Sequence, residues 1–300
     1  MNTDEIQARV HEGVQAIQNQ QLDVAAQIFE DVLVYDSQSA AAHCNLGMIE
    51  LIKQQPQKAL DHLLRAIQID NRMFHAYLNL GSAYFVVGEL EKSEQAYLKA
   101  SQIEPHNVDV YLNQGILYGQ MGQLSKARHA FERVLKTNAN SFQALFMLSS
   151  IYLDQNELYA AMANVLAAIR LEPANIESRI LLAEVYRRMG RYQAAEKELL
   201  ALLQERPDLM TPRVRLAIVY IESNRHAEAL PLLEKAIDSG IDTLQVYELC
   251  GILYEEQGQI DKAQEMYQQI LLLDPDNDSA AQGLSRIERL PQMGASLLGQ

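Results

Sequence analysis

The chain has 300 residues with a formal net charge of −14, 48% hydrophobic residues, 14 glycines and 8 prolines. This composition is typical of a folded soluble protein, and a repeat array of this length can form one body. The negative charge argues against nucleic acid or an anionic membrane surface as the main partner, because both would repel the chain at long range.

Cysteine usage and the N-terminal residues indicate the compartment. Cys44 and Cys250 are too few for a disulfide framework, which favours a reducing environment. Residues 1–5 lack the basic start and apolar core of a signal peptide, and no apolar run is long enough to span a bilayer. We therefore expect a cytoplasmic protein with no direct membrane insertion.

A period of 34 residues runs along the chain. It is marked by tyrosines at Tyr84, Tyr118, Tyr152, Tyr186, Tyr220 and Tyr254. Small residues keep the same period at Ala25, Ala59, Ser93, Ala127, Ala161, Ala195, Ala229 and Ala263. Bulky residues follow at Phe29, Leu63, Tyr97, Phe131, Val165, Leu199, Leu233 and Tyr267. An apolar residue and a small one precede each tyrosine position, at Leu46-Gly47, Leu80-Gly81, Leu148-Ser149, Leu182-Ala183, Leu216-Ala217 and Cys250-Gly251. Gln114-Gly115 is the polar exception.

Each period predicts two helices joined by a tight turn, because its middle carries a residue suited to the left-handed conformation. The first two units have Gln20 and Gln54 at that place, which predicts looser turns. The next six have Gly88, Gly122, Asn156, Gly190, Asn224 and Gly258. Prolines end several second helices, at Pro105, Pro173, Pro207 and Pro275.

Two other prolines have positional meaning. Pro56 suits a helix start, whereas Pro231 falls inside a second helix and is predicted to bend it or to remove a hydrogen bond. Beyond the last unit, Ala281, Leu284, Ile287 and Leu290 recur at helical spacing. They predict a capping helix over 278–291, stopped by Pro291, and a flexible tail over 292–300.

Together these ladders resemble the tetratricopeptide repeat, whose Leu-Gly, Tyr, Ala, aromatic and Pro signature they reproduce in order. The resemblance implies an all-α fold, a right-handed α-α superhelix with a C-terminal capping helix. Its eight units would be 6–39, 40–73, 74–107, 108–141, 142–175, 176–209, 210–243 and 244–277.

The sequence contains none of the usual spacings of an active site, so we expect no enzymatic activity, no cofactor and no metal. The seven histidines are scattered. His43 and Cys44 are adjacent, but neighbouring residues on a helix point in different directions, which makes them a poor metal site.

The resemblance further implies that the first helix of each unit lines a concave groove. Three units place an asparagine at the equivalent site, at Asn45, Asn79 and Asn113. This column resembles the asparagine ladder of the repeats attached to O-linked N-acetylglucosamine transferases, where the amides grip a ligand's main chain. Solvated asparagines are the alternative interpretation.

An apolar stripe flanks the asparagines, at Met48, Leu51, Leu78, Phe85, Leu112, Ile116 and Phe146. It would be a binding patch if open to solvent and core if neighbouring helices cover it. We expect a mixture in which Phe85 and Phe146 are the exposed anchors. Arg187 and Arg188 are predicted to face an acidic group, although charged residues on a helix usually form only a solvated face.

The function that these features favour is a non-enzymatic scaffold or adaptor that binds a partner peptide or helix. The partner would be basic or neutral, because residues 1–107 and 210–300 each carry 14 acidic against 7 basic side chains. Two alternatives stay open at this stage. One is a self-assembling structural protein that forms homo-oligomers, and the other is the substrate-recruiting subunit of a separate enzyme.

Overall fold

The computed structural model describes residues 1–241 and 243–297, and this part of the chain is built from α-helices without a strand. The helices are α1 (Thr3–Gln18), α2 (Leu22–Tyr35), α3 (Ala40–Ile52), α4 (Pro56–Ile69), α5 (Phe74–Val86), α6 (Leu90–Ile103), α7 (Val108–Gln120), α8 (Leu124–Thr137), α9 (Phe142–Asp154), α10 (Leu158–Leu171), α11 (Ile176–Arg188), α12 (Tyr192–Glu205), α13 (Met210–Glu222), α14 (His226–Asp238), α15 (Leu244–Glu256), α16 (Ile260–Leu273) and α17 (Asp278–Leu297). None of them is long and apolar enough to cross a membrane.

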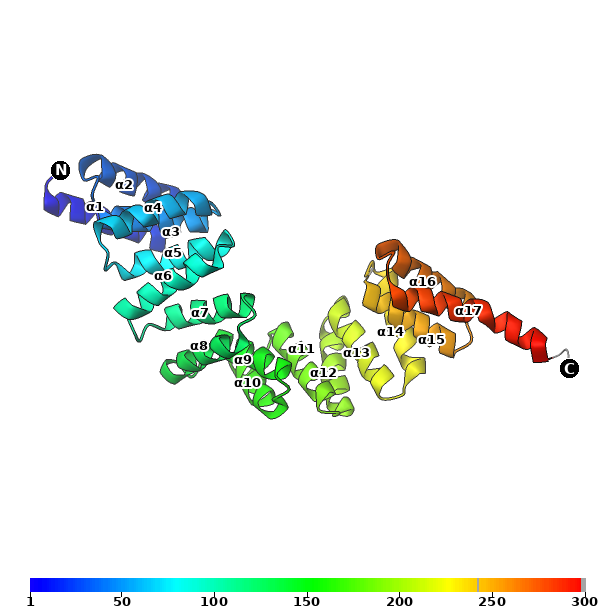
Figure 1. Ribbon diagram of the computed structural model, residues 1–300. Helices are drawn as coiled ribbons and strands as arrows, with labels where there is room; N and C mark the ends of the chain where they lie inside the picture. Colours follow the sequence, from blue (N-terminus) through cyan, green and yellow to red (C-terminus); the bar gives the residue numbers. More distant parts are fainter. Residues whose placement is uncertain (242, 298–300) are drawn as a thin grey trace. The chain divides into compact units, whose positions relative to one another are not determined.

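The chain forms two compact units, Met1–Ile151 and Tyr152–Gln300. In the first unit, consecutive helices pair as hairpins, α1 with α2, α3 with α4, α5 with α6 and α7 with α8 (Figure 1). The first helices of successive hairpins, α1, α3, α5 and α7, also contact one another in turn. They form one continuous layer, which brings equivalent residues of neighbouring hairpins side by side.

Small residues on the first helices match bulky residues on the second helices. A Cβ added at Gly81 would come within 2.4 Å of the Tyr97 ring, and one at Gly115 within 2.6 Å of the Phe131 ring. Tyr97 and Phe131 are buried, so neither ring has room to retreat. The 34-residue ladders are therefore a packing code, in which glycine lets an aromatic ring reach across the hairpin.

The turns inside the first two hairpins are as tight as the others, which corrects the expectation of looser turns there. Gln20 and Gln54 adopt left-handed φ angles of 60° and 58°, close to those of the glycines and asparagines at the equivalent places. The same hydrogen bond closes the turns, from Gln55 N to Glu50 O at 2.8 Å and from Gln123 N to Tyr118 O at 2.8 Å. Packing of the hairpin thus outweighs the cost of about 1 kcal/mol that a side chain adds in this conformation.

The second unit repeats the same plan, with hairpins α11–α12, α13–α14 and α15–α16. Helix α17 packs against α16, where a Cβ at Gly283 would meet the Tyr267 ring at 2.6 Å (Figure 1). Ile287 and Ala280 are buried on this face and Leu284 is half-buried, whereas Ala281 is exposed. The capping face predicted from the sequence is therefore shifted by one residue at its first position.

The end of the chain also differs from the prediction. Helix α17 continues through Pro291 to Leu297, so neither the expected stop at Pro291 nor a tail beginning at residue 292 is correct. A proline removes one N–H from the helical ladder and strains one turn, but it does not by itself force the chain out of a helix. The rest of the expected tail, residues 298–300, lies outside the described residues.

Candidate functional site

A groove with a volume of about 510 Å³ lies between the first helices of the first three hairpins. Its walls come from α1, α3 and α5 together with the turn before α5, and the lining residues are Val14, Ala41, Cys44, Asn45, Met48, Met73, His75, Leu78 and Asn79. The structure therefore brings four of the predicted site residues together, namely Asn45, Met48, Leu78 and Asn79.

The other predicted residues lie elsewhere on the first helices. Leu112, Asn113 and Ile116 are half-buried on α7, which contacts α5, and Phe85 is near the C-terminal end of α5. Phe146 is on α9, and Arg187 and Arg188 are at the end of α11 in the second unit. They do not line the groove.

The groove asparagines are half-buried and only partly engaged by the chain itself. The Asn45 side-chain amide donates to the Ala41 carbonyl at 2.9 Å, which leaves its oxygen free to accept. Burial raises the pKa of the Cys44 thiol to about 11, and a hydrogen bond with the Asn79 side chain opposes that shift. A buried neutral thiol is inert, so Cys44 contributes shape to the groove rather than reactivity.

Phe85 and Phe146 are half-buried, which corrects their prediction as exposed anchors. Phe85 packs against a core cluster that includes Phe74, Tyr97 and Leu117. Phe146 stacks on Phe142, with ring centroids 6.1 Å apart and planes inclined by 13°. Part of each ring is therefore covered by other residues of the chain. The apolar side of such a helix faces mainly the core, so its aromatic residues are not fully exposed.

Arg187 faces acidic groups, as predicted, and the carboxylates belong to this chain. Its guanidinium bonds to Glu184, with 2.9 Å from Nε to Oε2, and to Glu222. Burial of Glu184 disfavours its charge, but the bond and charge interactions with Arg187 outweigh burial and lower its pKa. Arg188 is exposed and donates to Asn156 Oδ1 at 3.3 Å.

Sequence reasoning missed five groove residues, namely Val14, Ala41, Cys44, Met73 and His75. A signal was present for three of them, because Ala41, Cys44 and His75 each lie four residues, one helical turn, before a predicted site residue and so on the same side of the helix. Those site residues are Asn45, Met48 and Asn79 in turn. Val14 and Met73 come from a neighbouring helix and a turn, so only the packing of three hairpins places them at the groove.

His43 and His62 make a close pair beside this layer, with their Nδ1 atoms 3.2 Å apart. Burial lowers the pKa of His43, and the charges of His62 and Arg65 lower it further. Across the described residues, no group of three histidine, cysteine, aspartate or glutamate side chains is placed to hold a metal ion.

The lowered pKa of His43 predicts that the folded chain becomes less stable in mild acid. His43 holds its proton more weakly in the folded chain than in the unfolded chain, so its contribution is complete above the unfolded pKa of about 6.5 and declines as pH falls below it. Thermal unfolding followed by circular dichroism between pH 7.5 and 5 should show a smaller acid-induced drop in Tm for His43→Gln than for the native chain. His106→Gln, at an exposed histidine, is the matched control and should keep the native pH dependence. Identical pH dependence in all three proteins would contradict this assignment.

Stacked helical hairpins of equal length, with a groove lined by their first helices, define an α-solenoid of short repeats. Family models of the tetratricopeptide repeat match residues 12–74, 74–107, 96–129, 172–240 and 208–274. These matches extend over most of the chain, and the chain belongs to the tetratricopeptide repeat family. A model described as anaphase-promoting complex, cyclosome, subunit 3 matches residues 120–202. No curated protein matches the chain.

Solved structures share the fold at low sequence identity. A tetratricopeptide repeat protein from Parabacteroides merdae superposes with a TM-score of 0.67 at 18% identity, covering 84% of this chain and 99% of that one. Pseudomonas aeruginosa PilF gives 0.63 at 22% identity, covering 70% and 96%. YrrB, described as having an unusual peptide-binding site, gives 0.56 at 19% identity, covering 62% and 96%. The fold is in general a scaffold for protein–protein interaction.

Proposed function

We propose that this chain is a non-enzymatic scaffold that binds an extended or helical segment of a partner protein along the first helices of its N-terminal unit. The observation that carries the proposal is the groove between α1, α3 and α5, whose walls hold Asn45 and Asn79 one hairpin apart. The chemistry of the groove matches such a segment. A side-chain amide both donates and accepts, which is what a peptide main chain requires whatever its sequence. Met48 and Leu78 supply apolar surface beside the amides.

Asn113 extends the column to a third hairpin on α7, which contacts α5. An extended peptide that runs across successive first helices would meet one asparagine amide per hairpin. The acidic excess of residues 1–107 favours basic or neutral segments, because it repels an acidic segment and slows its association with the chain. Recognition of a helix would instead rely mainly on Met48 and Leu78.

Capture by a photo-reactive amino acid tests the location. Placed at Met48, it should cross-link a partner in cell extract, whereas the same group at Val34, which is exposed on α2, should not. Capture of nothing but further copies of this chain would replace the proposal by the self-assembling alternative. Equal capture from both positions would show that the groove has no special role.

The amides are then tested with the captured segment as a synthetic peptide. Asn45→Ala, Asn79→Ala and Asn113→Ala combined in one chain should weaken binding about tenfold or more in isothermal titration calorimetry, because each lost amide leaves peptide groups unpaired. Asn164→Ala is the matched control. Its amide makes the same kind of bond as Asn45, to Ala160 O at 2.9 Å, but on a second helix of the other unit. Unchanged affinity of the triple variant would remove the asparagines from recognition.

A further inference from the structure

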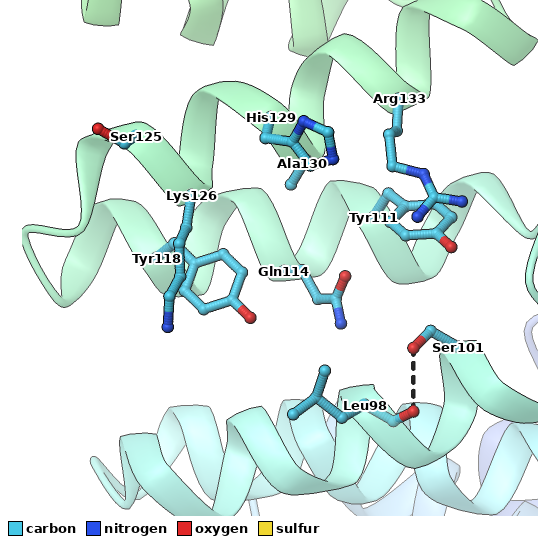
Figure 2. A pocket seen from close by; sticks show the side chains of 10 residues that line it. All are labelled: Leu98, Ser101, Tyr111, Gln114, Tyr118, Ser125, Lys126, His129, Ala130 and Arg133. Atoms are coloured by element: carbon cyan, nitrogen blue, oxygen red, sulfur yellow. Dashed lines mark hydrogen bonds between the residues drawn. The ribbon is translucent and has the colours of Figure 1, made fainter.

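A second hollow, with a volume of about 390 Å³, lies on the other side of the hairpins, between the second helices α6 and α8 and above α7 (Figure 2). It is separate from the groove described above and shares no lining residue with it. Its volume falls within the range of about 300–1,000 Å³ that is usual for small-molecule pockets.

The floor of this pocket departs from the repeat pattern at two positions simultaneously. Gln114 stands where other hairpins have Leu46, Leu80, Leu148, Leu182, Leu216 and Cys250. Ser101 stands at a place that is apolar in all the other units, with Leu33, Ile67, Leu135, Ile169, Leu203, Ile237 and Leu271. Ser101 is shorter than leucine or isoleucine, so it leaves space where the other hairpins have a packed side chain. Both departures line the same hollow, Ser101 from α6 and Gln114 from α7.

Gln114 is buried, with 5% of its surface exposed, yet its amide makes no hydrogen bond within residues 1–241 and 243–297. Figure 2 shows the amide between Tyr111 and Tyr118, directed across the hollow toward Leu98. The amide is not among the fully buried side-chain atoms that lack a partner in the described ranges, so it is open to the hollow and available to a ligand, whereas leucine at the same place is the fold's usual solution. Ser101 also turns its hydroxyl hydrogen to its own helix, donating to the Leu98 carbonyl at 2.9 Å, so its lone pairs stay available.

The walls of the pocket are aromatic and its mouth is cationic. The Arg133 guanidinium lies 4.0 Å from the centroid of Tyr111, and Lys126 Nζ lies 5.0 Å from that of Tyr118. Lys126 is partly neutralised by Glu94 at 3.2 Å. Arg133 donates to the Pro105 carbonyl at 3.4 Å, and no carboxylate in the described ranges pairs with it. Leu98, 43% exposed, adds apolar surface at the rim.

We propose that this pocket binds a small aromatic carboxylate that carries a hydroxyl group on its ring. The ring lies between Tyr111 and Tyr118, where offset or edge-on packing of aromatic groups is favourable. The hydroxyl reaches Gln114, because a hydroxyl both donates and accepts and therefore satisfies the amide in either orientation. The carboxylate meets Arg133, whose planar guanidinium suits it. The preceding hairpin has Tyr77, Tyr84, Lys92 and Lys99 at the equivalent places but a leucine and an isoleucine on the floor, so the polar floor is what distinguishes this site.

The probe for the test is 4-hydroxyphenylacetate, used with the full chain and followed by NMR signals of the side-chain amides. The Gln114 amide signals should shift on titration, with a Kd of about 1 mM or tighter. Phenylacetate lacks the hydroxyl and 4-hydroxyphenylethanol lacks the carboxylate, and each should bind about tenfold more weakly. Absence of any shift with 4-hydroxyphenylacetate at about 10 mM would overturn the proposal.

Variants of the floor provide a second readout. Gln114→Met, of similar length but without the amide, should weaken binding about tenfold, whereas Leu80→Met in the preceding hairpin should leave the affinity unchanged. Gln114→Leu combined with Ser101→Leu restores the packing of the other hairpins, so it should abolish binding and raise Tm by about 2–5 °C. Full affinity in either Gln114 variant would contradict the proposal, even if the chain became more stable.

Discussion

Replacing Gly115 by alanine is expected to lower the free energy of unfolding by about 1–3 kcal/mol, the usual cost of an overpacked core. The added Cβ would lie 2.6 Å from the Phe131 ring, which is completely buried. Because the interior around a buried ring is close-packed, the ring cannot move away from the added methyl group without displacing other side chains. Urea denaturation followed by circular dichroism measures the loss.

A second substitution in the same chain should restore much of that stability. Other hairpins pair alanine with leucine at these places, as in Ala183 with Leu199 and Ala217 with Leu233. Phe131→Leu alone should cost about 1–2 kcal/mol through lost volume. Combined with Gly115→Ala it should cost less than the two single changes together, with a coupling of about 0.5–3 kcal/mol.

Gly119 is the matched control for this cycle. It lies in the same helix, α7, but a Cβ there would have no neighbour within 4 Å. Gly119→Ala should therefore stabilise the chain by about 0.5–1 kcal/mol, because alanine has the higher helix propensity. Effects of opposite sign at Gly115 and Gly119 would separate steric fit from helix propensity, and a Gly115→Ala variant as stable as the native chain would refute the packing code.

The fold could be predicted from the sequence because its information is local and repeated. Gly88 and Asn156 mark turns by backbone sterics alone, and the glycines opposite Tyr97 and Phe131 mark close approach across a hairpin. The left-handed conformation of Gln20 and Gln54 could not be predicted from the residue type at the turn. Their conformation is imposed by packing of the whole hairpin, which the turn residue does not encode.

The site was only partly predictable, because it depends on which side chains meet across different helices. The period identifies Asn45 and Asn79 as equivalent, and this is enough to place them in one groove. Nothing in the period reports that Glu222 on α13 bonds to Arg187 on α11. The sequence singled out Gln114 as an exception to the repeat pattern. The hollow beside it depends also on Ser101, which lies on the preceding helix and lines the same hollow.

Replacing Pro231 by alanine is expected to raise the free energy of unfolding by about 2 kcal/mol. Pro231 lies inside α14 and is exposed, so it removes a helical hydrogen bond without filling a core. An interior proline costs about 3 kcal/mol relative to alanine, and about 0.4–1 kcal/mol of this is returned because proline also restricts the unfolded chain. Urea denaturation should show a higher midpoint, and amide hydrogen exchange should slow in α14.

Pro56 supplies the control, because it occupies the first position of α4, where the missing N–H would have no helical partner. Pro56→Ala should lower the free energy of unfolding by about 0.4–1 kcal/mol, since only the unfolded-chain effect remains. Comparing the two variants separates the effect of a proline inside a helix from the effect of a proline at a helix start. Similar effects at both sites would show that α14 accommodates Pro231 without losing helical stability. In Pro231→Ala the first unit should keep its native exchange rates, because a repeat array transmits stability mainly between neighbouring hairpins.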